Sequence, residues 1–396
     1  MFLIFPTMKA LKSFAKSQYK RTFLLNFDYV ADSFYGCATA RLTASLARQR
    51  VDMFDKRRSA LSRRHFAVLA GSMALAGMTL GQAAAAEGRL RIAKQFGVVY
   101  LLLNVIEDQK LVEKHGKDAG LDIAVEYVQL SGGSAVNDAL LSGSVDIGGA
   151  GVGPLFTLWD RTRGRQGVKG VASLGNFPYY LVSNRPEVKT IADFTDVDRI
   201  AVPAVGVSVQ SRILQWASAK LWGDKDFAKL DKISVAVPHP EATAAIVKGG
   251  TEVTGHFANP PFQDQELAEN PNAHIVLNSY DVQGGPSSST VLYATERFYK
   301  ESPKTYAAFV DALDEAAKFV TANPEKAADI YIKATNSKLD RELLLKVIKN
   351  PQVSFKIEPQ NTLGLGQFMH RVGAIKAEPK SLSDYFFASP RTAAGS

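Results

Sequence analysis

The chain has 396 residues and a formal net charge of +8 at pH 7, which invites a nucleic-acid-binding interpretation. Residues 1–86 hold 13 of the 47 basic and 4 of the 39 acidic side chains, which leaves 34 basic and 35 acidic residues downstream. The downstream part is close to neutral, so composition excludes a polyanion-binding surface there and we expect no nucleic-acid partner.

An export signal is predicted within residues 1–86. Arg63 and Arg64 precede Phe66, an apolar run of about 15 residues continues to about Leu80, and Ala84–Ala86 supplies an A-x-A cleavage site. The run is shorter than the roughly 20 residues of a membrane-spanning helix. We therefore predict a twin-arginine leader and a periplasmic protein. Residues 1–52 precede a natural start at Met53 and are interpreted as a spurious extension or a long leader.

The position of the single cysteine excludes thiol chemistry from residues 87–396. The only cysteine is Cys37, so residues 87–396 offer no disulfide, thiol nucleophile or thiolate metal ligand. No lipid-attachment cysteine follows the apolar run. We expect an exported protein that is not lipid-anchored and that carries neither metal nor cofactor.

Strand patterns alternate with helical ones after residue 87. Strands are predicted at 90–94, 121–130 and 145–149, and the helical segments between them end near Glu113 and Leu141. This alternation predicts parallel βαβ units and an α/β fold with mixed, mainly parallel sheets flanked by helices.

The same pattern recurs about 106 residues later. Residues 135–143 align with residues 241–249, and the strands that follow also match. The collinear matches predict two α/β lobes of similar build. Lobe I is predicted to comprise residues 87–182 and 290–396, and lobe II residues 183–289.

Two extended crossings are predicted to join the lobes. The first is Leu181–Asn184, and the return passes through residues 284–289 into a strand at 290–294. Helical patterns at 305–321 and 324–333 follow, and we expect this tail to pack back on lobe I. Two independent domains on a string are the alternative interpretation.

Two glycine-containing junctions are candidate ligand sites. Residues Ser131, Gly132, Gly133 and Ser134 lie between a strand and a helix, where Ser134 can cap the helix and free N–H groups attract anions. The corresponding junction of lobe II contains Gly206, Val207 and Ser208. An ordinary βα turn explains either junction alone, whereas two facing each other would offer donors to one small ligand.

Other strand ends supply further candidate contacts. These are Gln95, Phe96, Gly97, Gly149, Ala150, Gly151, Phe177, Tyr179, His239, Glu241, His256 and Asn259. The aromatic residues could form an apolar wall beside the polar contacts. Core packing explains any single aromatic residue as well, and a structural role explains either histidine.

Catalytic signals are weak. Neither 151–153 nor 206–208 completes a dinucleotide-binding or nucleophile-elbow pattern, and the histidines are not at metal-ligand spacing on a helix. We predict a protein that is not an enzyme and has no catalytic residues.

A set of short motifs carries a family resemblance. In chain order they are Leu90-Arg-Ile92, Lys110-Leu-Val-Glu-Lys114, the run at 140–148, Ile191-Ala-Asp-Phe194, Ile200-Ala-Val-Pro203 and the run at 240–246. Over roughly residues 88–375 the chain resembles the solute-binding proteins of nitrate/sulfonate/taurine-type ABC transporters. It departs from their pattern at residues 109–112 and in the bulky first turn at 95–99.

The resemblance implies a two-lobed periplasmic-binding-protein fold of type II. It also implies a monomer that closes on a small anionic organic solute, of the sulfonate, nitrate or carboxylate class, and delivers it to a permease and its ATPase. The implied contacts are the turns at 95–97, 131–134, 149–151 and 206–208 and the segment around His256. An enzyme or binder of the thiamine-pyrimidine type on the same fold, or a ligand-sensing subunit, remains the alternative.

Overall fold

The computed structural model describes residues 87–390 and 393–396. The predicted twin-arginine leader, its cleavage site and Cys37 lie outside the described residues.

The first of two five-stranded sheets has the order β2-β1-β3-β10-β4. Its strands are β1 (Arg89–Lys94), β2 (Ala124–Gln129), β3 (Ile147–Gly151), β4 (Lys169–Ser173) and β10 (Thr290–Ala294). Strand β1 runs parallel to β2 and β3, whereas β10 runs antiparallel to β3 and β4. The predicted strands at 90–94, 145–149 and 290–294 are confirmed to within two residues.

The second sheet has the corresponding order, β7-β6-β8-β5-β9. Its strands are β5 (Tyr180–Ser183), β6 (Arg199–Val202), β7 (Ser234–Ala236), β8 (Val253–Phe257) and β9 (His274–Asn278). Here β6 runs parallel to β7 and β8, and β5 runs antiparallel to β8 and β9. The internal repeat is therefore confirmed at the level of topology, with β3 and β8 offset by 106 residues.

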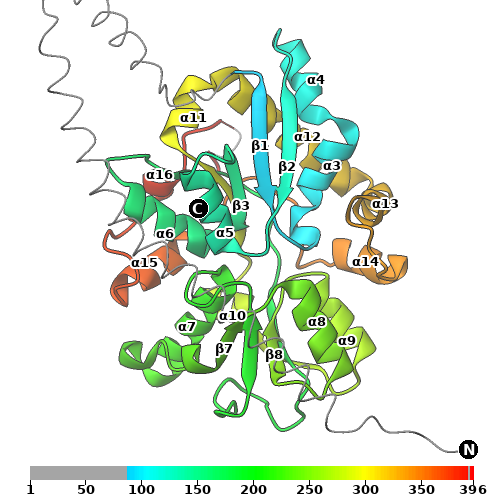
Figure 1. The fold of residues 1–396 in the computed structure, drawn as a ribbon, viewed down its shortest axis with the longest axis vertical. Coiled ribbons are helices and arrows are strands. Elements are labelled where there is room, and N and C mark those ends of the chain that lie inside the picture. The colour runs from blue at the N-terminus through cyan, green and yellow to red at the C-terminus, as the bar shows by residue number, and fades with distance from the viewer. Residues whose placement is uncertain (1–86, 391–392) are drawn as a thin grey trace, which may run out of the picture. The chain divides into compact units, whose positions relative to one another are not determined.

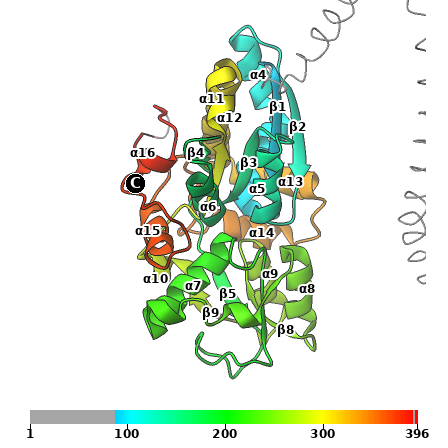
Figure 2. The ribbon, with the colours of Figure 1, turned by 60° about the vertical axis from the view of Figure 1, so that its left-hand side comes forward.

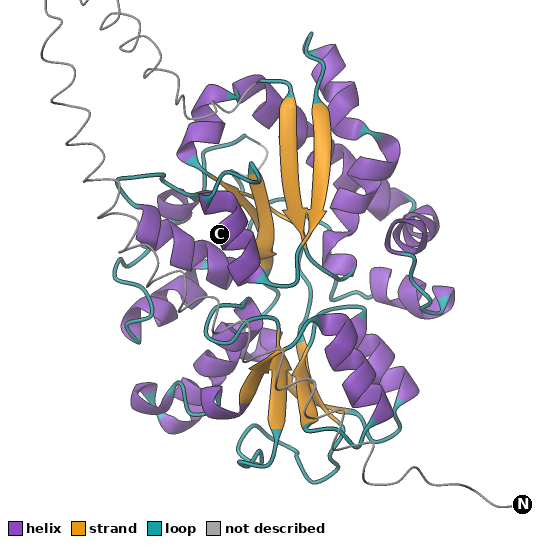
Figure 3. Cartoon of the chain, in the orientation of Figure 1, coloured by secondary structure: helices purple, strands orange, loops and turns teal. Residues whose placement is uncertain are grey.

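Helices flank both sheets, as Figure 3 shows. Those associated with the first sheet are α3 (Leu101–Gln109), α4 (Leu111–Asp118), α5 (Gly133–Leu141), α6 (Val152–Thr162), α11 (Glu296–Glu301), α12 (Pro303–Ala322), α13 (Pro324–Thr335) and α14 (Arg341–Ile348). Helix α12 packs on α3 and α4, which confirms that the tail returns to the first sheet. The single helix predicted to end near Glu113 is wrong, because Lys110 adopts a left-handed backbone (φ 51°) and divides it into α3 and α4.

The second sheet is covered by α7 (Val209–Trp222), α8 (His239–Lys248), α9 (Phe262–Glu269) and α10 (Ser279–Gln283) (Figure 1). Near the C-terminus, α15 (Leu363–Arg371) packs against both α6 and α7, and α16 (Leu382–Tyr385) follows it (Figure 2). The Phe368 ring of α15 stacks on Trp216 of α7 at 5.6 Å. Within the described residues, no helix has the length and hydropathy to cross a membrane.

The chain passes between the sheets twice. It leaves β4 at Ser173 and enters β5 at Tyr180, and it returns from α10 into β10 at Thr290. The predicted crossing at Leu181–Asn184 is wrong, because residues 180–183 pair with β8 and β9 inside the second sheet. The predicted lobe boundary at residues 182 and 183 falls inside this strand, and the lobe assignments stay a prediction.

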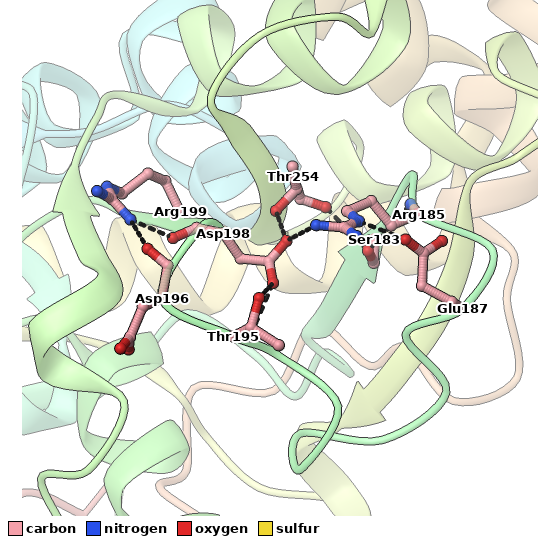
Figure 4. Close-up of polar contacts among 8 residues, drawn as sticks. All are labelled: Ser183, Arg185, Glu187, Thr195, Asp196, Asp198, Arg199 and Thr254. Atoms are coloured by element: carbon pink, nitrogen blue, oxygen red, sulfur yellow. Dashed lines mark hydrogen bonds and ion pairs between the residues drawn. The ribbon is translucent and has the colours of Figure 1, made fainter.

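The buried Asp198 carboxylate forms hydrogen bonds to residues in or next to three strands of the second sheet, as Figure 4 shows. Asp198 precedes β6 and accepts hydrogen bonds from the Thr195 backbone N–H at 2.7 Å and from the Thr254 hydroxyl of β8 at 2.8 Å. The Arg185 guanidinium, just beyond β5, donates to the same carboxylate at 2.8 Å. These hydrogen bonds outweigh the opposing effect of burial and lower the pKa of Asp198 below its ordinary 3.8.

Candidate functional site

A small cavity lies where the two halves of the fold meet. Its walls come from the carboxyl ends of the parallel strands and from the starts of the antiparallel strands β5 and β10, in both sheets. The lining residues are Gln95, Tyr100, Gly133, Gly151, Pro154, Tyr179, Ser208, Val209, Gln210, His239, Asn259 and Thr290. The cavity measures about 20 Å³, enough for one water molecule.

Four helices begin at this cavity. Gly133 is the first residue of α5, Gly151 is the N-cap of α6, Ser208 is the N-cap of α7, and His239 is the first residue of α8. The N-terminus of each helix carries unsatisfied N–H groups and a partial positive charge. Because α5 and α6 flank the first sheet and α7 and α8 the second, both halves direct positive potential at one point. No lining residue is a Lys, Arg, Asp or Glu.

Glycines allow the two halves to touch around the cavity. We call Gly97, Gly132, Gly151 and Gly153 the glycine seam. A Cβ atom on Gly97 would lie 2.4 Å from Asn259 Oδ1, and one on Gly132 would lie 2.7 Å from the carbonyl oxygen of Pro203. At Gly151 and Gly153 the nearest groups belong to α7 and the residues before it. The seam therefore brings the halves into backbone contact.

Hydrogen bonds accompany this contact. The Val98 backbone N–H donates to the Pro260 carbonyl at 2.9 Å, and Asn259 Nδ2 donates to the Phe96 carbonyl at 3.4 Å. Asn259 Oδ1 is buried and has no hydrogen-bond partner. A buried carbonyl without a partner is costly, so the contact between the halves at Asn259 leaves one acceptor unsatisfied.

Hydroxyl and amide groups of the first half and of the joining segment before β5 surround the cavity. Gln95 Nε2 and the Tyr100 hydroxyl both donate to the Gly149 carbonyl, at 3.1 and 3.2 Å. The Tyr179 hydroxyl is hydrogen-bonded to Thr290 Oγ1. Burial raises the pKa of both tyrosines, so their hydroxyls remain protonated.

A chain of buried side chains leads away from the cavity into the second half. Gln210 Nε2 lies 3.2 Å from His239 Nε2, and His239 Nδ1 lies 2.7 Å from His256 Nε2. His256 Nδ1 is hydrogen-bonded to Glu266 Oε1 on α9. Burial, followed by the neighbouring His256, lowers the pKa of His239 well below its ordinary 6.5, so His239 is neutral at pH 7.

The structure gathers some of the sequence-predicted residues at the cavity. Gln95, Gly133, Gly151, Tyr179, Ser208, His239 and Asn259 line it. Gly97 and Gly132 belong to the seam, the carbonyls of Phe96 and Gly149 accept the hydrogen bonds described above, and His256 lies behind His239.

The other predicted residues lie away from the cavity. Ser131, Ser134 and Glu241 are exposed, Ala150 is buried within β3, and Gly206 and Val207 are half-buried in the turn before α7. The Phe177 ring packs against Phe355 at 5.4 Å, which is the core-packing role. Ser134 does not cap α5, because Gly132 is its N-cap, whereas Ser208 does cap α7 by accepting from the Ser211 N–H.

Several site residues were absent from the sequence prediction. Tyr100, Pro154, Val209, Gln210 and Thr290 line the cavity, and Glu266 ends the buried chain. Gln210 lies two residues after Ser208 in the same junction, so extending that turn into its helix would have found it. Glu266 carries no such signal, because it lies on a helix remote from the strand ends. Within the described residues, no group of three or more His, Cys, Asp or Glu side chains is placed to hold a metal ion.

Solved structures share this fold. The alkanesulfonate-binding protein SsuA from Xanthomonas axonopodis pv. citri, bound to MOPS, is 19% identical with a TM-score of 0.57, covering 74% of this chain and 96% of its own. The periplasmic nitrate-binding protein NrtA from Synechocystis PCC 6803 is 15% identical with a TM-score of 0.60, covering 75% and 84%. The aliphatic sulphonate-binding protein SsuA from Escherichia coli is 15% identical with a TM-score of 0.55, covering 77% and 94%.

These likenesses confirm the predicted two-lobed periplasmic-binding-protein fold of type II. No curated protein matches the sequence. The family model described as NMT1/THI5 like matches residues 116–327. Because this segment is more than half of the chain, the protein belongs to the NMT1/THI5-like family.

Proposed function

We propose that this protein is the exported solute-binding subunit of an ABC importer, and that it captures a small anionic organic solute by hinge closure. The observation that carries the proposal is the convergence of four helix N-termini, two from each half, on one neutral cavity. Such a site favours an anion without needing a basic side chain.

Closure follows from the size of the cavity and its position. A space of about 20 Å³ holds one water molecule, so a sulfonate or carboxylate enters only when the halves separate. The two segments that join the sheets, residues 174–179 and 284–289, are short enough to act as hinges. Contacts from both halves to one solute would then favour the closed state.

The structural relatives support the same function. SsuA and NrtA carry names that assign them to alkanesulfonate and nitrate binding, and this chain shares their fold. We propose the same location, the periplasm, with export by the twin-arginine route, and a permease and an ATPase as partners. The proposed role is binding and delivery without catalysis.

A matched pair of ligands tests the proposal. We expect ethanesulfonate, nitrate or a small carboxylate to raise the thermal unfolding temperature of the purified protein, whereas ethylammonium, a cation with the same ethyl group as ethanesulfonate, leaves it unchanged. At a hundredfold excess over its dissociation constant, a ligand stabilises the folded state by about 2.7 kcal/mol. Stabilisation by ethylammonium but by none of the anions would contradict the proposal. Stabilisation by pyrimidines alone would favour the thiamine-pyrimidine alternative.

A further inference from the structure

The chain of side chains behind the cavity carries an inference that rests on the proposed function. We call Gln210, His239, His256 and Glu266 the histidine relay. All four residues are buried: Gln210 and His239 are 4% exposed, and His256 and Glu266 are 0% exposed. The relay begins at the cavity wall, where Gln210 and His239 line the space, and ends at a carboxylate on α9.

The fold itself does not require the two histidines. With the 106-residue offset of the repeat, His239 corresponds to Gly133 and His256 to Ala150 of the first half. Both positions therefore accept small apolar residues in the same architecture, at the start of α5 and in β3. The relay is a feature of the second half alone.

The Glu266 carboxylate at the end of the relay lacks hydrogen-bond partners for one of its two oxygens. Glu266 Oε1 accepts from the Thr243 hydroxyl at 2.8 Å and contacts His256, while Oε2 is buried without a hydrogen-bond partner. Within the described residues, His256 is the only basic side chain in ion-pair range of Glu266. Since an unpaired buried charge is costly, uptake of one proton by the Glu266–His256 pair would stabilise this part of the fold.

The position of that proton sets the direction of every hydrogen bond in the relay. When His256 is neutral, its Nδ1–H donates to Glu266, its Nε2 accepts from His239 Nδ1–H, and His239 Nε2 is an acceptor facing Gln210. When His256 is an imidazolium, its Nε2–H donates to His239 Nδ1. Neutral His239 then carries its proton on Nε2 and donates to Gln210, whose amide turns to accept with Oε1 and leaves its Nε2 as the donor at the cavity.

An anion in the cavity distinguishes these two states. The unprotonated relay presents an acceptor at the cavity and a net negative charge behind it, both of which oppose an anion. The protonated relay presents a donor and is neutral overall. We propose that the solute is bound together with one proton, which the Glu266–His256 pair holds while His239 Nε2 donates to the Gln210 side-chain oxygen and Gln210 Nε2 faces the cavity.

Other titratable groups lie near the relay, and their effect on the pH dependence of binding must be distinguished from that of the relay. Asp264 lies two residues before Glu266 on α9, and burial, followed by Glu266, raises its pKa to about 7. On α7, Arg212 lies beyond Gln210 and donates to Gln215, which in turn donates to Asp231. Glu241 of α8 is exposed, and Tyr100 of the first half and Tyr179 of the joining segment line the cavity as protonated phenols.

Calorimetry with nitrate and ethanesulfonate tests the proposal, because both anions remain charged between pH 6 and 8. Uptake of one proton per bound anion makes affinity rise about tenfold per pH unit as the pH falls. Titrations in buffers of different ionisation enthalpy should show uptake of close to one proton per anion by the unmodified protein. Binding with no proton uptake would overturn the coupling and leave the proposed function standing. Binding of neither anion at either pH would overturn both.

Two substitutions on α9 show which carboxylate is responsible for the proton uptake. Glu266→Gln removes the buried charge that holds the proton, so the affinity should change less than about twofold between pH 6 and 8. Asp264→Asn removes the neighbouring acid and should keep the full pH dependence. The reverse pattern, with the dependence lost in Asp264→Asn and kept in Glu266→Gln, would overturn the assignment. Should Glu266→Gln not fold, the proton count of the unmodified protein and the Asp264→Asn slope decide the question.

Discussion

Gly132→Ala is expected to weaken solute binding by about ten- to a hundredfold while the protein remains folded. Gly132 has an extended backbone (φ −169°), so an alanine there causes no conformational strain. Its Cβ would nevertheless lie 2.7 Å from the carbonyl oxygen of Pro203, a backbone atom of the opposite half that cannot move cheaply. Overpacking of this kind costs about 1–3 kcal/mol. The cost falls on the closed state only, so it reduces the apparent affinity.

Ser134→Ala is the matched control for this prediction. Ser134 lies two residues away, is exposed and does not cap α5. We expect its affinity to equal that of the unmodified protein, measured by calorimetry with the same anion. Equal affinities for Gly132→Ala and the unmodified protein would show that the seam does not close on the solute.

Asp198→Ala is expected to lower the free energy of unfolding by about 3 kcal/mol, because it removes the carboxylate that pairs with Arg185 in a buried hydrogen-bond network. Asp198 is 1% exposed and binds Thr195, Thr254 and Arg185, which hold together the ends of β5, β6 and β8. Without the carboxylate, these donors lose a buried partner. Chemical denaturation at pH 7 measures the change.

Asp196→Ala provides the control two residues away. The Asp196 side chain is 80% exposed and pairs with Lys232 on the surface, so its removal should leave the free energy of unfolding close to that of the unmodified protein. A loss of stability in Asp196→Ala equal to that in Asp198→Ala would contradict the network as the cause.

The contribution of Asp198 should also depend on pH. Its folded-state pKa is lowered below the ordinary 3.8, so the carboxylate stabilises the fold above that value. The stability is lost as the pH falls through the folded-state pKa. The difference between the unmodified protein and Asp198→Ala should therefore be constant from pH 5 to 7 and shrink below about pH 4.

Most of the fold was predictable because periodicity and repetition are properties of the local sequence. The strands at 90–94 and 290–294 and the helix at 324–333 follow from their patterns, and the 106-residue offset gave two similar sheets. The crossing at Leu181–Asn184 was assigned wrongly, because a short apolar strand and an extended linker have the same local pattern. Only its pairing with β8 and β9 distinguishes them.

The sequence indicated where the candidate site would lie, although its role in binding stays a prediction. Strand ends converge at one edge of a sheet, so Gln95, Ser208 and Asn259 were predicted as contacts, and all three line the cavity. The glycines were expected to make room for a ligand, whereas the structure shows Gly132 making room for the opposite half. Glu266 could not be found, because its partnership with His256 depends on how α9 packs against β8.

Closure of the two halves on an anion is most directly tested by single-molecule energy transfer. Labels at Lys117→Cys in α4 and Lys248→Cys in α8, with Cys37→Ser, place one dye on each half at exposed positions. Saturating the protein with the anion that stabilises it should convert a broad or low-transfer distribution into one narrow, high-transfer population. In Gly132→Ala, the same conversion should require at least tenfold more anion. An unchanged distribution at an anion concentration that calorimetry shows to be saturating would contradict closure.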